Sequence, residues 1–69
     1  MTNKERADRV ERALILYRVI YGDSHKSDEE DVIDFLTDLR HFCGRAKMAL
    51  GELDRIAHSH YVAELEEAR

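Results

Sequence analysis

The most regular pattern of apolar and polar positions in the chain lies between residues 27 and 44. Its apolar residues recur mainly at steps of three and four, so they lie on one side of an α-helix. These residues are Val32, Phe35, Leu36, Leu39, Phe42 and Cys43. Ser27 and Glu30 form the capping-box pair that is typical of a helix start, and Gly44 is a common helix stop. The pattern predicts a helix over about 28–43.

A second apolar pattern covers residues 4–21 and predicts another helix. One stripe alternates steps of three and four, like the seam of a coiled coil. It consists of Ala7, Val10, Leu14, Tyr17 and Tyr21. Ile15, Leu16 and Val19 lie on other sides of this helix, so its second half is apolar nearly all round and needs cover on several sides. We therefore expect these three residues to contact a second copy of the chain or another partner, with a tightly enclosed central helix as the alternative.

The third predicted helix covers about 50–67, and its start is the least defined boundary. Its inner face combines apolar residues with one histidine and one carboxylate: Leu53, Ile56, Ala57, His60 and Glu64. Residues 22–26 have the glycine, aspartate and serine content of a turn. The second helix could run on through Arg45 and Ala46, since Ala46 continues its apolar stripe. We expect instead a break at Gly44, followed by a short connection in which Met48 and Leu50 close the end of the core.

Three helices with short connections predict an all-α three-helix fold in a single domain covering residues 1–69. We expect the second and third helices to form an antiparallel hairpin, with the first helix across its apolar side. A core of this size seldom contributes more than about 3–5 kcal/mol of net stability. One cysteine excludes an intrachain disulfide, so self-association is the expected supplement and a homodimer is predicted.

Composition indicates the cellular location of the protein more clearly than its function. The charged start of the chain predicts no signal peptide, and no apolar run approaches the roughly 18–20 residues that span a membrane. A single free thiol is typical of a reducing compartment, so a cytoplasmic location is expected. The net charge of −4 disfavours nucleic acid as a partner.

Charge is unevenly distributed along the chain. Residues 1–21 contain five basic and three acidic residues, whereas residues 22–39 contain one lysine and seven acidic residues. A basic first helix and an acidic second helix favour packing against each other, within one chain or between subunits. The acidic face also predicts a surface for another, basic protein. Its candidate residues are Asp28, Glu29, Asp31, Asp34 and Asp38. Helix capping and a solvated face are the ordinary alternative.

The candidate chemistry is sparse. The pairs His41/Cys43 and His58/His60 are two residues apart, so on a helix their side chains point in nearly opposite directions and cannot hold one ion. We expect no metal, no cofactor and no catalytic residues, because three short helices leave little room for an enclosed pocket. Cys43 is expected to be a small core residue and His60 a hydrogen-bonded core or boundary residue, although neither role is decided by the sequence.

A DNA-binding regulator is the main alternative from another functional class. The second and third helices, joined by a short turn, could form a helix-turn-helix. Before the last residue, however, the third helix carries only one firm cation, Arg55, among several carboxylates. A helix that enters a DNA groove needs cations that face phosphates. The basic residues of the first helix could contribute in a dimer, so a small dimeric DNA-binding regulator stays open.

Residues 29–66 resemble small uncharacterised proteins encoded in prophages and mobile elements of proteobacteria. The resemblance lies in an acidic lead-in, the run from Leu36 to Cys43, the run from Leu53 to Ala57, and the pair His60-Tyr61. The connection Lys47-Met48-Ala49 departs from the more polar, acidic cap of those proteins. The resemblance implies a helical accessory protein of phage or plasmid origin. Together with the residues above, it leads us to expect a non-enzymatic protein-binding module, with inhibition of a host complex as a mode of action.

Overall fold

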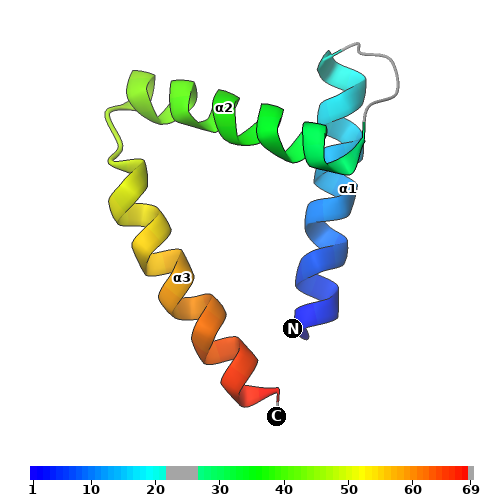
Figure 1. Cartoon of the computed structure of the whole chain (residues 1–69), viewed down its shortest axis with the longest axis vertical. Coiled ribbons are helices and arrows are strands. Elements are labelled where there is room, and N and C mark those ends of the chain that lie inside the picture. The colour runs from blue at the N-terminus through cyan, green and yellow to red at the C-terminus, as the bar shows by residue number, and fades with distance from the viewer. Residues whose placement is uncertain (22–26, 69) are drawn as a thin grey trace.

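A computed structural model of the chain describes residues 1–21 and 27–68. They form three helices, α1 (Asn3–Tyr21), α2 (Asp28–Ala46) and α3 (Leu50–Glu67), and no strand occurs in these two ranges (Figure 1). The all-α three-helix fold is therefore confirmed, and the bounds of α1 and α3 agree with the predicted ranges to within one residue. The turn predicted at 22–26 lies outside the described residues.

The start of α2 follows from its capping residue. The side-chain oxygen of Ser27 accepts a hydrogen bond from the backbone N–H of Glu30, at 3.2 Å. Four acidic residues occupy the first turn, where the helix dipole favours negative charge: Asp28, Glu29, Glu30 and Asp31. The N-terminus of this helix is thus defined locally and agrees with the prediction.

The end of α2 differs from the prediction. The helix continues through Gly44 to Ala46, and the chain turns at Lys47, whose backbone is left-handed with φ 58° and ψ 40°. The N–H of Met48 donates to the Cys43 carbonyl at 2.9 Å, which closes the last turn. Glycine permits a helix to stop but does not require it. Arg45 and Ala46 are good helix formers, and they carry the helix past Gly44.

Lys47→Gly is expected to stabilise the protein by about 0.5–1 kcal/mol, because the left-handed conformation penalises a side chain and not glycine. Urea unfolding followed by circular dichroism measures the change. Lys47→Ala is the matched control, since it removes the charge but keeps the Cβ atom, and it should give no comparable gain. If the alanine variant gains as much as the glycine variant, backbone strain is not the cause.

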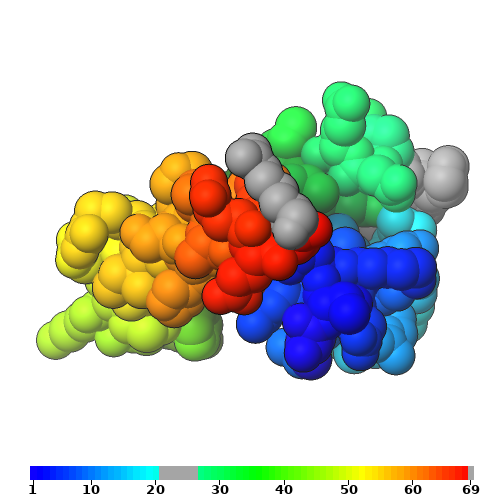
Figure 2. All heavy atoms as spheres, turned by 90° about the horizontal axis from the view of Figure 1, so that it is seen from below, coloured from blue at the N-terminus to red at the C-terminus, as the bar shows by residue number. Residues whose placement is uncertain are grey.

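The helices meet near their ends and enclose an open angle. α1 crosses α2 near the C-terminal end of α1, while α3 diverges from α2 and brings its C-terminal end toward the start of α1 (Figures 1 and 2). The side chains of Asn3 and Arg6 contact Glu64, at 3.2 Å to its carbonyl and 3.0 Å to its carboxylate. The expected close hairpin of the second and third helices, covered by the first, is replaced by this open arrangement.

The chain consequently buries few apolar side chains. Within the described ranges Cys43, at 3% exposure, is the only buried apolar residue, which confirms its interpretation as a small core residue. The radius of gyration is 14.0 Å, whereas a compact chain of this length has about 11 Å. The accessible surface is 6036 Å², whereas about 4,500 Å² is typical of a folded monomer of this mass. Single-chain packing therefore leaves a large apolar surface uncovered.

The position of His60 also reflects this open packing and differs from the prediction. It was expected in the core or at its boundary, where a neutral imidazole needs a hydrogen-bond partner. In the structure it is exposed, like most of α3. The inner face of α3 has the periodicity of a buried face, but among the described residues α1 contacts it only near its C-terminal end, at Glu64.

Candidate functional site

The five carboxylates predicted to bind a partner do not share one environment. The side chain of Asp28 is 99% exposed and Glu29 is also exposed, whereas Asp31 retains only 4% exposure. Asp34 is half-buried and its backbone carbonyl accepts a hydrogen bond from the Tyr17 hydroxyl at 3.4 Å. A partner can reach the start of α2 from solvent, but it cannot reach Asp31.

The buried carboxylate belongs to a polar junction between α1 and α2. Arg18 of α1 donates a hydrogen bond to Asp31 and lies 3.6 Å from the carboxylate of Asp28. This pairing realises, within one chain, the packing expected from the opposite charges of the two helices. The sequence could not indicate which of the arginines and carboxylates would meet, because that depends on where the helices cross.

Tyr17 completes this junction. Its hydroxyl hydrogen-bonds to the carboxylate of Asp38, and its ring packs edge-on against Phe35 with the centroids 5.5 Å apart. Asp38 thus has a structural role as well as an exposed position. The sequence placed it on an acidic face that is either solvated or bound by a partner, because the acidic pattern shows charge and spacing but not which residues of another helix lie against it.

The three residues predicted for self-association form an exposed patch on α1. Ile15, Leu16 and Val19 are 51%, 60% and 71% exposed, and Ile20 beside them is more exposed still. By helical spacing, Leu16 and Val19 lie on the side of α1 opposite the stripe that carries Tyr17 and meets α2. The patch is accessible, as self-association through it requires. Whether a second copy covers it stays a prediction.

A groove of about 520 Å³ lies at the corner between α2 and α3. Its apolar lining comes from both helices and from the connection between them: Leu36, Leu39, Cys43, Met48 and Leu50. Arg40 and Asp54 supply charged groups at the same groove. Sequence reasoning missed it, since a close helical hairpin would have filled this space with its own side chains.

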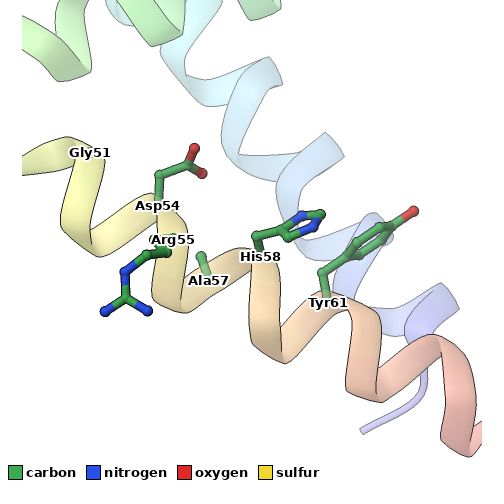
Figure 3. A pocket seen from close by; sticks show the side chains of 6 residues that line it. All are labelled: Gly51, Asp54, Arg55, Ala57, His58 and Tyr61. Carbon is green, nitrogen blue, oxygen red and sulfur yellow. The ribbon is translucent and has the colours of Figure 1, made fainter.

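A second hollow of about 520 Å³ lies along α3 alone and is more open to solvent than the groove. Figure 3 shows the side chains of Asp54, His58 and Tyr61 on one side of the helix, with the rings of His58 and Tyr61 6.5 Å apart. Arg55 points elsewhere and donates to the carboxylate of Glu52, an interaction that raises the pKa of Arg55. The arrangement brings together no nucleophile and base, and it is open to solvent.

The described ranges also bear on metal, membrane and nucleic-acid contacts. Within 1–21 and 27–68, no three side chains among the histidines, cysteine and carboxylates are grouped as metal ligands. In the same ranges, no helix is both long and apolar enough to cross a membrane. Several cations that could face phosphates are instead paired with carboxylates, including Lys4 with Asp8 at 2.8 Å and Arg55 with Glu52.

Comparison with known protein families, with curated proteins and with solved structures found no match to this chain. Its candidate sites are therefore defined by its own geometry: the acidic start of α2, the apolar patch on α1, and the groove at the corner of α2 and α3.

Proposed function

We propose that this protein is a non-enzymatic protein-binding accessory module of phage or mobile-element type. The observation that carries the proposal is the uncovered apolar surface on all three helices. Monomeric soluble proteins rarely leave large contiguous apolar patches exposed, and such patches are typical of interaction sites. A free buried thiol, Cys43, agrees with a cytoplasmic setting.

The acidic start of α2 supports a basic protein as the larger partner. Asp28 and Glu29 are exposed, and Glu30 beside them is exposed as well. Exposed like charges steer an oppositely charged partner and set its orientation more than they add affinity. Asp31 holds α2 against α1 through Arg18 and so keeps this face in place rather than binding the partner itself. Inhibition of a host complex, the mode of action that the resemblance to phage proteins implies, is part of the proposal.

The double variant Glu29→Lys/Glu30→Lys tests this surface. We expect it to lose retention of a basic protein that the parent captures from a proteobacterial lysate, because the contact changes from attraction to repulsion. The retained protein is identified by mass spectrometry, and its affinity is then measured at two salt concentrations. Reversing the two charges should weaken the affinity for the basic protein, and the loss of affinity should be larger at low salt.

Glu66→Lys/Glu67→Lys is the matched control, because it changes the net charge equally at the far end of α3. We expect the control to bind like the parent. Equal losses in both variants would mean that net charge and not the start of α2 governs binding. No loss in the first variant would exclude this face as the partner site.

A small dimeric DNA-binding regulator is the second candidate. The observation in its favour is that Arg9 and Arg12 are exposed about one turn apart on α1. The pairing of Arg55 with Glu52 on α3, the helix that would enter a groove, is unfavourable to it. Salt-dependent retention on duplex DNA would support this function, whereas no retention at low ionic strength would exclude it.

A homodimer is part of the proposal, because a single chain buries so little of its apolar surface. The α1 patch of Ile15, Leu16 and Val19 is one surface for it. Leu16→Glu or Val19→Glu would break a dimer formed there while leaving the helix content largely unchanged, since both side chains lie in solvent in the single chain.

A further inference from the structure

We infer that the groove at the corner of α2 and α3 holds the α3 helix of a second copy, and that the exchange is reciprocal, so that two chains share one apolar core. This inference rests on the proposed function as a protein-binding module and names one partner, the chain itself. It also names a surface for self-association other than the predicted α1 patch.

The lining of the groove is suited to binding the apolar face of a helix. Leu36 and Met48 line it and are still 44% and 41% exposed in the single chain. Leu39 and Leu50 are half-buried in the same lining, and Cys43 is buried beneath them. An amphipathic helix binds such a groove through side chains at intervals of three and four residues.

α3 carries a stripe of that spacing that stays exposed in the part of the chain that the structure describes. Leu53, Ile56 and His60 follow steps of three and four and are all exposed. By helical spacing Ile56 and His60 lie on a different side of α3 from Gly51 and Asp54, which line the helix's own groove, whereas Leu53 adjoins Leu50 of the same lining. One copy can therefore present the stripe while keeping its groove open for the other copy. A two-fold axis requires this reciprocity.

The uncovered area matches what a stable homodimer needs. The single chain exposes 6036 Å², roughly 1,500 Å² more than a folded monomer of its mass. Removing that excess from two chains buries about 3,000 Å² in total, within the range of obligate homodimers. The α1 patch is one side of one helix, and covering it alone would leave the groove and the α3 stripe in water.

The first test is the solution mass, measured by light scattering over a concentration series. The parent should be a dimer, and Ile56→Glu should shift it to a monomer that retains its helical circular dichroism signal. Val19→Glu on the α1 patch is the contrasting variant and should remain dimeric. A parent that is monomeric at every concentration overturns the inference. So does a dimer that dissociates with Val19→Glu but not with Ile56→Glu.

The second test cross-links two introduced cysteines, because Cys43 is buried and Leu36 lines the same groove at 44% exposure. Leu36→Cys/Ile56→Cys, oxidised by air with a copper catalyst, should form a covalent dimer through a disulfide between position 36 of one chain and position 56 of the other. Leu36→Cys/Val62→Cys is the control, because Val62 lies about 120° around α3 from Ile56 and is equally exposed at 42%, and it should remain largely monomeric under denaturing, non-reducing conditions. Equal cross-linking in both variants, or none in either, contradicts the exchange.

Both tests can be separated from the proposed function. Capture of a basic protein that depends on Glu29 and Glu30, by a chain of monomeric mass, would keep the protein-binding module and remove the shared core. Conversely, a dimer that needs Ile56 but captures nothing through the acidic face would support this inference and remove the acidic docking surface.

Discussion

Arg18→Met is expected to destabilise the protein by about 3 kcal/mol, at the lower end of the effect of breaking a buried ion pair. Arg18 donates to Asp31, a carboxylate with 4% exposure, and methionine fills a similar volume without donating a hydrogen bond. The variant therefore leaves a buried charge without its partner. The side chain of Arg18 is itself 28% exposed, and solvent screening on that side is the reason for choosing the lower end.

The total stability of a domain of this size is only about 3–5 kcal/mol, so Arg18→Met should retain only about 0–2 kcal/mol and should unfold at a clearly lower temperature or urea concentration. Urea or thermal unfolding followed by circular dichroism measures the loss. Arg12→Met, also on α1 but exposed, is the matched control and should change the free energy of unfolding by no more than about 0.5 kcal/mol.

A double-mutant cycle separates the lost pair from a general effect of the substitution. Arg18→Met/Asp31→Leu removes both partners and leaves no buried charge, so it should recover much of the stability lost in Arg18→Met alone. If the double variant is as unstable as the sum of the two single variants, the pair is not coupled. The polar junction would then not be what holds α1 against α2.

Leu39→Ala is expected to cost about 2–3 kcal/mol, the lower part of the range for truncating a core leucine. Leu39 is half-buried and lines the corner between α2 and α3, next to Cys43. Its removal enlarges a groove that is already incompletely filled. The loss is measured as the change in urea midpoint at an unchanged slope.

Ile33→Ala on the outer side of α2 is the control for this prediction. Ile33 is 61% exposed, so its truncation should alter the free energy of unfolding by about 0.5 kcal/mol or less. A Leu39→Ala variant that unfolds like the parent would refute the central position given to α2 in the fold.

The sequence determined the three helices and most of their ends, because these depend on neighbouring residues. The steps of three and four in α2, the Ser27 cap and the absence of proline all act within a few positions of one another. The end of α2 was the exception. Gly44 only permits a stop, and the chain turns at Lys47 because the residues between them favour a helix.

Only the tertiary structure decided which of the acidic residues face a partner and where the apolar surface lies. The charge pattern indicated an acidic helix, but the crossing of α1 and α2 placed Asp31 against Arg18 and left Glu29 in solvent. The apolar periodicity of α3 indicated a buried face, but the angle at the corner left that face open (Figure 1). Periodicity states that a helix face should be buried. What covers it depends on how helices distant in sequence meet, and for this chain we infer that a second copy provides the cover.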